Sequence, residues 1–174
     1  MFEYLSSYRI VLVSGPHRSG TTIITRMIAH DTGARYCTEE AFGHDNRDGW
    51  LELIADPERK VIQCPSMCAH LEEPGQADDV AAVMVWRTFD DILASQAVIG
   101  WTPEGQYADR YQAELALYGS LKQPLARVKY SEWEDGQSQN ITHPFDVHYE
   151  SLTEHPLWLP KAVRANFGPR QVAL

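Results

Sequence analysis

The sequence has 174 residues, of which 44% are hydrophobic, and its formal net charge is −9. A chain of this length can bury about 70% of the surface that it exposes when unfolded, so we expect one globular domain over residues 1–174. The acidic balance argues against nucleic-acid binding, and no apolar stretch is long enough to span a membrane. Three cysteines without framework spacing and the lack of a visible signal peptide predict a reducing compartment, the cytoplasm.

Short apolar runs alternate with amphipathic segments along the chain. The run at 8–14 predicts a buried strand, and the segment after Gly20 predicts a helix that ends at Gly33. Further strands are expected at 60–64, 80–86, 126–130 and 145–152, an extended segment at 34–42, helices at 48–58, 89–101 and 103–123, and a loop at 131–143. This alternation predicts an α/β fold with a mostly parallel sheet.

The stretch VSGPHRSGTT places a glycine loop between the first strand and the first helix. Gly15 and Gly20 have the spacing of a nucleotide-binding loop, but Thr21 stands where such a loop has a lysine. Backbone amides at the start of a helix attract anions, and Arg18 adds a bidentate donor. The loop therefore predicts phosphate binding, although GxxxxG alone also occurs in ordinary turns.

A second cation follows the strand at 80–86. Arg87 ends this strand, and Ser95 comes eight residues later in the next helix. Because ligands bind at the carboxyl edge of a parallel sheet, both residues can approach the glycine loop. Considered alone, this pair favours the ordinary interpretation of a surface arginine at a strand end and a serine on a solvated face.

Taken together, these segments resemble the sulfotransferase family. Its first motif is similar to Pro16–Thr22, its second to Arg87 and Ser95, and its Tyr-Glu-Asp-Leu segment to Val147–Pro156. The resemblance implies a three-layer αβα fold with a P-loop-like strand–loop–helix. It also implies a donor, 3′-phosphoadenosine 5′-phosphosulfate, which becomes 3′,5′-ADP.

The resemblance also implies a role for each motif residue. The 5′-phosphate would contact Arg18, Ser19, Gly20, Thr21 and Thr22, and the 3′-phosphate would contact Arg87 and Ser95. Arg18 would in addition stabilise charge on the leaving phosphate. The acceptor would be a hydroxyl or amine of a small molecule, carbohydrate or peptide, and neither nucleic acid nor membrane is expected as a partner. No metal is expected, because the histidines show no ligand-spaced pair and no apolar strand ends in Asp.

A general base should take the proton of the acceptor. Cys37–Glu40 is similar to the Cys-Gly-Glu-Glu segment of tyrosylprotein-type sulfotransferases, which makes Glu40 the first candidate and Glu39 its reserve. His70 and His44 are the other candidates. For each of them, a solvated surface side chain is the alternative interpretation.

The sequence also departs from the family. The late Arg-Lys-Gly loop is not recognisable, and Arg164 and Arg170 are the proposed replacements. The acceptor would contact aromatic residues that could equally be core: Phe42, Trp101, Tyr107, Tyr111 and Trp133. Two alternatives stay open, a P-loop kinase of a small molecule and a non-catalytic nucleotide-binding protein that keeps the fold.

Overall fold

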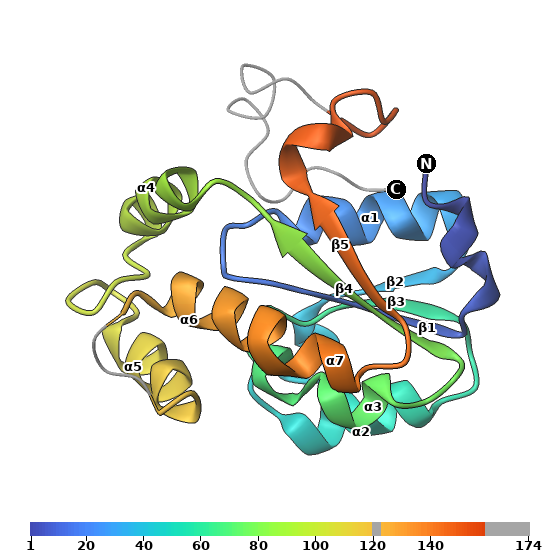
Figure 1. The fold of residues 1–174 in the computed structure, drawn as a ribbon, viewed down its shortest axis with the longest axis horizontal. Coiled ribbons are helices and arrows are strands. Elements are labelled where there is room, and N and C mark those ends of the chain that lie inside the picture. The colour runs from blue at the N-terminus through green and yellow to red at the C-terminus, as the bar shows by residue number, and fades with distance from the viewer. Residues whose placement is uncertain (120–122, 159–174) are drawn as a thin grey trace.

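The computed structural model of the protein describes residues 1–119 and 123–158. Its centre is a five-stranded sheet in the order β2-β3-β1-β4-β5, in which every neighbouring pair is parallel. The strands are β1 (Ile10–Ser14), β2 (Arg35–Cys37), β3 (Lys60–Gln63), β4 (Val80–Trp86) and β5 (Pro144–His148). The α/β fold with a parallel sheet is thus confirmed (Figure 1).

Helices connect the strands. The α-helices are α1 (Thr21–Thr32), α2 (Arg47–Ala55), α3 (Glu72–Gly75), α4 (Phe89–Ile99), α5 (Ala108–Leu117), α6 (Leu125–Glu132) and α7 (Ser138–Asn140). Short 3₁₀ helices are η1 (Glu3–Ser7), η2 (Glu39–Ala41), η3 (Pro65–His70) and η5 (Tyr149–Leu152), and η4 (Trp133–Gln137) is a π-helix. Among the described helices, none is both long and apolar enough to cross a bilayer.

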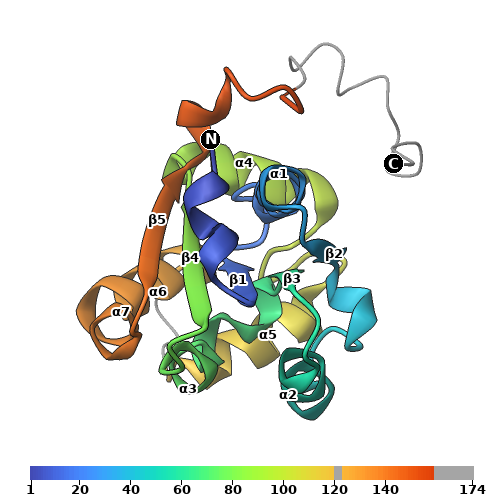
Figure 2. The same ribbon diagram turned by 90° about the vertical axis from the view of Figure 1, so that its right-hand side faces the viewer.

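Both faces of the sheet are covered, which gives three layers (Figure 2). Side chains alternate along each strand, so β1 sends Ile10 and Leu12 to one face and Val11 and Val13 to the other. The first face packs against α2, η3 and α6, and the second against η1, α1 and η5. Burial on both faces explains why the strands are continuous apolar runs.

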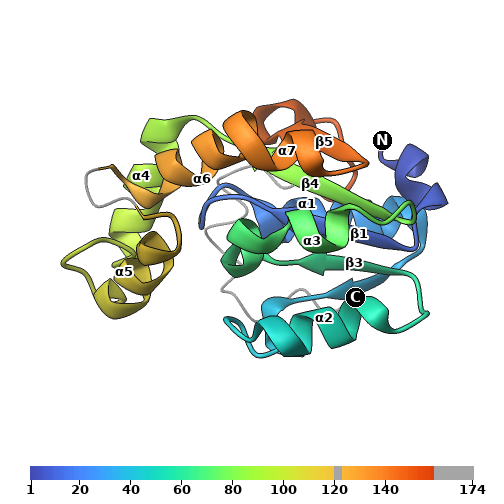
Figure 3. The same ribbon diagram turned by 60° about the horizontal axis from the view of Figure 1, so that its bottom comes forward.

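Helices α4 and α5 lie at one end of the molecule, beyond the carboxyl ends of the strands (Figure 3). They have a small hydrophobic cluster of their own, which is built around Trp101, Tyr111 and Leu115 and closed by Leu125 and Val128. The carboxyl edge of the sheet is therefore flanked by a helical wall.

Two sequence predictions in this half of the chain are wrong. The expected strand at 126–130 is helix α6, and the expected loop at 131–143 is largely helical, as α6, η4 and α7. The five residues 126–130 are too few to show the helical spacing of the buried positions, which extend from Leu125 to Trp133. Packing of Trp133 into the core outweighs the polar composition of its neighbours. The helix expected from Pro103 begins later, at Ala108, because residues 102–107 form turns.

Candidate functional site

The glycine loop joins β1 to α1 in a backbone conformation that few residues adopt. Gly15 and Gly20 have φ angles of 148° and 109°, and Arg18 is one of two described non-glycine residues with positive φ, at 74°. A side chain at Gly15 would lie within 3.0 Å of the Val85 carbonyl oxygen and closer still to Ser19 Oγ. The loop therefore depends on its glycines, and the strain at Arg18 marks it as a candidate site.

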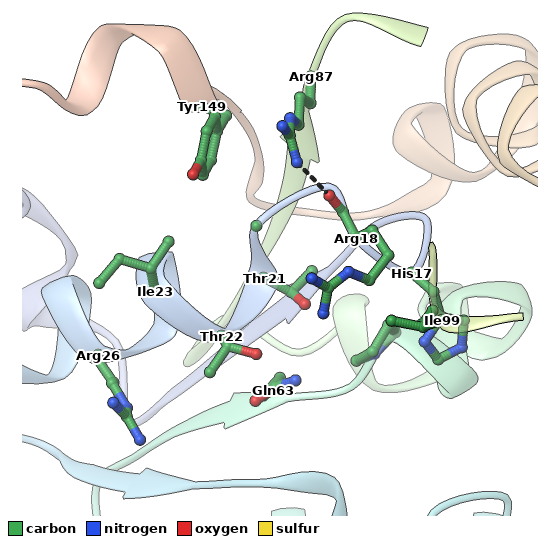
Figure 4. Close-up of a pocket in the computed structure, with 12 residues that line it drawn as sticks. His17, Arg18, Thr21, Thr22, Ile23, Arg26, Gln63, Arg87, Ile99 and Tyr149 are labelled. Carbon is green, nitrogen blue, oxygen red and sulfur yellow. Dashed lines mark hydrogen bonds between the residues drawn. The ribbon is translucent and has the colours of Figure 1, made fainter. Parts of the chain in front are cut away.

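A pocket of about 380 Å³ opens over this loop (Figure 4). Its walls come from the loop, the first turns of α1, the end of β3 with the start of η3, the end of α4 and the segments after β4 and β5. The residues that line it are His17, Arg18, Gly20, Thr21, Thr22, Ile23, Arg26, Gln63, Pro65, Arg87, Ile99 and Tyr149. Three arginines but neither aspartate nor glutamate are among them, in a protein whose net charge is −9.

The structure brings Arg18, Arg87 and Ser95 together, as the sequence predicts. Arg87 Nη1 donates a hydrogen bond of 2.9 Å to the carbonyl oxygen of Arg18 (Figure 4). Arg18 Nε donates one of 3.0 Å to Ser95 Oγ. Within the described part of the chain, the buried Nε of Arg87 has no hydrogen-bond partner. An unsatisfied buried donor of this kind is a feature that a bound anion would satisfy.

Tyr149 closes the pocket from the end of β5. The guanidinium of Arg87 lies 4.8 Å from the centre of its ring, a cation–π contact. A Cβ atom built on Gly20 would lie 2.3 Å from Tyr149 Cδ2, so only glycine fits beneath the ring. The segment that resembles the third family motif thus contacts the first motif directly.

The other residues of the loop have different exposures. Thr21 is buried and Thr22 is exposed, and both line the pocket. Ser19 is fully buried and does not line it, and its backbone amide donates to the carbonyl oxygen of Pro16 at 3.0 Å. The first backbone N–H groups of an α-helix have no partner within the helix, and the helix dipole favours an anion beside them. The start of α1 is therefore suited to a phosphate group. Ser95 contacts Arg18 without lining the pocket, so it holds Arg18 in place.

Glu40 and Glu39 follow β2, at the same edge of the sheet but outside the lining of the pocket. Glu40 is exposed, and a hydrogen bond from Thr38 lowers the pKa of its carboxyl group. Glu39 is buried, and its Oε1 accepts a hydrogen bond of 2.8 Å from the amide of Ser66. Glu39 thereby joins η2 to η3. The role of Glu40 as a base stays a prediction.

The two candidate histidines also lie outside the pocket. His70, at the end of η3, lines a separate shallow pocket with Glu72 and Glu73, and burial and the nearby Arg47 lower its pKa. His44 lies 3.8 Å from Glu39, on the loop before α2. The structure therefore brings neither histidine to the arginine-lined pocket.

The aromatic residues expected to contact an acceptor are mostly core. Phe42, Trp101, Tyr111 and Trp133 are each at most 4% exposed and belong to hydrophobic clusters. Tyr107 is 37% exposed, yet it does not line the pocket. Arg164 and Arg170, the proposed replacements for the late loop, lie outside the described residues.

One group of possible metal ligands cannot be recognised from the spacing of its residues in the sequence. His30, Asp31 and His155 each place a ligand atom within 4.8 Å of the others. The amide of Leu157 donates to His155 Nδ1 at 3.1 Å, so Nε2 carries the proton and donates to Asp31. Metal binding at Nε2 would require the opposite tautomer. The cluster therefore works as a hydrogen-bond network, and the expectation of no metal stays a prediction.

Seven residues of the pocket lining are not among the site residues that the sequence predicts: His17, Ile23, Arg26, Gln63, Pro65, Ile99 and Tyr149. Arg26 comes one helical turn after Thr22, so helical spacing could have placed it on the same face. Its guanidinium lies 5.5 Å from the centre of the Tyr36 ring, and the Tyr36 hydroxyl donates to Gln63 at 3.3 Å. His17 belongs to the segment that resembles the first family motif, but the resemblance assigns it no role.

A scan of family models and a search of curated proteins found no match to this sequence. Among solved structures, the chain is similar to a shikimate kinase from Acinetobacter baumannii in complex with shikimate, with 11% identity, a TM-score of 0.49 and coverage of 84% of this chain and 88% of the kinase. A sugar kinase from Janibacter sp. has 19% identity, a TM-score of 0.45 and coverage of 78% and 99%. An uncharacterized protein from Eubacterium ventriosum has 10% identity, a TM-score of 0.43 and coverage of 80% and 88%.

Two of these three proteins are kinases by name. At TM-scores below 0.5 the likeness carries no argument about function. The parallel sheet with its strand–glycine loop–helix shows a P-loop-like fold, and the function is argued from the site.

Proposed function

We propose that this protein is a group transferase that binds the phosphate groups of a nucleotide donor over the loop from Gly15 to Thr22. The observation that carries the proposal is the lining of the pocket, which contains loop residues and three arginines but no carboxylate. Such a lining suits a ligand with two separate phosphates, one on the loop and one beside Arg87.

The finer proposal is transfer of a sulfuryl group from 3′-phosphoadenosine 5′-phosphosulfate. A kinase holds its phosphates with a loop lysine and a carboxylate-bound Mg²⁺. Here Thr21 occupies the lysine position and the pocket offers no carboxylate ligand. A donor that needs neither group is consistent with both features.

A P-loop kinase is the second candidate, and one observation favours it. Thr22 lines the pocket and stands at the position where the Ser or Thr of a nucleotide-binding loop contacts Mg²⁺. On this view Arg18 or Arg26 would replace the missing lysine.

Thermal unfolding with different nucleotides separates the two candidates. At a hundredfold excess over its Kd, 3′,5′-ADP without metal should add about 2.7 kcal/mol of stability, which corresponds to about 5–10 °C in Tm for a chain of this size. A shift with MgATP and none with 3′,5′-ADP would instead identify a kinase. The third outcome is a shift with 3′,5′-ADP without catalysis. If the protein releases no 3′,5′-ADP from the sulfated donor with sugars, phenols, peptides or amines as acceptors, it is a non-catalytic binding protein.

Arg87→Ala tests the second phosphate position. Loss of its charge-assisted hydrogen bonds should weaken 3′,5′-ADP binding about 10- to 100-fold and leave 5′-AMP binding nearly unchanged. Arg59→Ala is the matched control, because Arg59 is exposed and does not line the pocket. Equal affinity of the two variants for 3′,5′-ADP would remove Arg87 from the site.

A further inference from the structure

His17 differs from the other histidines considered as a base, because it lines the arginine-lined pocket itself. Its side chain is 17% exposed, and the ring packs 4.2 Å from the indole of Trp101. Gln96 Nε2 donates a hydrogen bond of 2.8 Å to the backbone carbonyl oxygen of His17. Both the backbone and the ring are thus held in place from α4 and the segment that follows it.

A buried carboxylate holds one nitrogen of the imidazole. His17 Nε2 lies 2.9 Å from Oε1 of Glu114 on α5, which is 6% exposed. Burial by itself raises the pKa of Glu114, but the nearby Lys129 ammonium and the His17 ring outweigh it and bring the pKa to about 2. The carboxylate is therefore ionised and can only accept hydrogen bonds.

Lys129 of α6 completes a buried chain of charges behind the pocket. Its Nζ lies 2.7 Å from Glu114 Oε2, close enough for an ion pair although the geometry is not that of a hydrogen bond. It also donates a hydrogen bond of 2.8 Å to the carbonyl oxygen of Pro65, another residue of the pocket lining. Burying two charges costs free energy, so the presence of this ion pair is weak evidence that it serves only to stabilise the fold.

The arrangement fixes the tautomer of His17. Because Glu114 only accepts, Nε2 of the neutral ring carries the proton and Nδ1 keeps its lone pair. Within residues 1–119 and 123–158, no hydrogen bond to this Nδ1 is found. A pocket histidine whose far nitrogen is fixed by a buried carboxylate has the arrangement that a general base requires.

We propose that His17 is the general base of the transfer reaction and that Glu114, supported by Lys129, is its positioning residue. The inference rests on the proposed function. His17 Nδ1 takes the proton of the acceptor hydroxyl or amine while the acceptor atom forms a bond to sulfur. The bond between sulfur and the phosphate oxygen breaks, 3′,5′-ADP leaves with the electron pair, and the proton later passes from His17 to water.

The first test compares His17→Ala with Glu40→Gln and His70→Ala. His17→Ala should lower kcat about 10²- to 10⁴-fold while the Kd for 3′,5′-ADP changes less than threefold, and added imidazole should restore part of the rate. Glu40→Gln and His70→Ala should each lower kcat less than His17→Ala does, because neither side chain lines the pocket. A rate loss in Glu40→Gln or His70→Ala together with a normal rate in His17→Ala would overturn the proposal and leave the proposed function standing.

The second test needs no acceptor. In ¹H–¹⁵N NMR spectra of the wild-type protein above neutral pH, His17 should show the Nε2–H tautomer with an unprotonated Nδ1. Glu114→Gln combined with Lys129→Met avoids an unpaired buried charge, and it should remove this tautomer preference and lower kcat at unchanged 3′,5′-ADP affinity. The Nδ1–H tautomer in the wild type would overturn the assignment of His17. Failure of the wild type to bind 3′,5′-ADP would overturn the proposed function and the base role with it.

The pH profile distinguishes a base from a merely structural residue. The charged groups around the His17 ring are Glu114, Lys129, the adjacent Arg18 and Arg110, whose guanidinium lies 5.7 Å from the Trp101 ring centre. A general base must be unprotonated to take the proton of the acceptor, so the wild-type kcat should fall on the acidic side of its pH profile. His17→Ala should lose this acidic limb, and its persistence in that variant would contradict the proposal.

Discussion

Substitution of Gly20 by alanine should damage both the stability of the protein and its phosphate site. Gly20 has a φ of 109°, which L-residues rarely adopt, and forcing one there costs about 1–3 kcal/mol. The new Cβ would lie 2.3 Å and 2.6 Å from Cδ2 and Cε2 of Tyr149, and overpacking of this kind costs about 1–3 kcal/mol more. We therefore expect a loss of about 2–6 kcal/mol in unfolding free energy.

Gly33→Ala is the matched control at the other end of α1. Gly33 has a φ of 65°, and a Cβ atom built on it meets nothing within 4 Å, so its replacement should cost only about 1–2 kcal/mol of backbone strain. Urea unfolding of both variants gives the comparison, and titration with 3′,5′-ADP reports on the site. Gly33→Ala should retain wild-type affinity, and Gly20→Ala should not.

The double variant Gly20→Ala, Tyr149→Ala separates strain from overpacking. Removing the ring should recover the overpacking part, about 1–3 kcal/mol, which a double-mutant cycle measures as a coupling energy. If Gly20→Ala loses no more stability than Gly33→Ala, or if the cycle shows no coupling, then Tyr149 does not pack on the loop and the reasoning is refuted.

Three further predictions concern polar side chains and their partners. The folded-state pKa of Glu114, about 2, lies below the 4.5 of an unperturbed glutamate, so its contribution to stability is present above pH 4.5 and is lost as the pH falls toward 2. The difference in stability between wild type and Glu114→Gln, measured by urea unfolding, should therefore narrow in that range by about 3 kcal/mol. Lys129→Met alone should destabilise the protein by about 3–5 kcal/mol, and Glu114→Met together with Lys129→Met should recover most of that loss; a double variant as unstable as the single one would contradict the ion pair. Asp146 Oδ1 accepts hydrogen bonds of 2.7 Å from Trp86 Nε1 and 3.0 Å from Trp133 Nε1, so Asp146→Ala should cost about 1–3 kcal/mol and shift the indole NMR signals, and unchanged signals would count against this bridge.

The sequence alone predicted the features that local patterns encode. The apolar runs that became β1, β3 and β4 are buried on both faces, so their hydrophobicity is continuous and easy to recognise. Because parallel strands present their carboxyl ends at one edge, the sequence also predicted that Arg87 and Ser95 approach the loop at Arg18.

Only the tertiary structure decided what depends on contacts between distant segments. Tyr149 covers Gly20 from more than a hundred residues away, and Glu114 and His17 meet across 97 positions. No periodicity signals such pairs, because each partner acquires its environment only when the sheet edge and the α4–α5 wall come together. The same reason explains the wrong strand at 126–130: its five residues alternate locally, but packing against the core selects the helix.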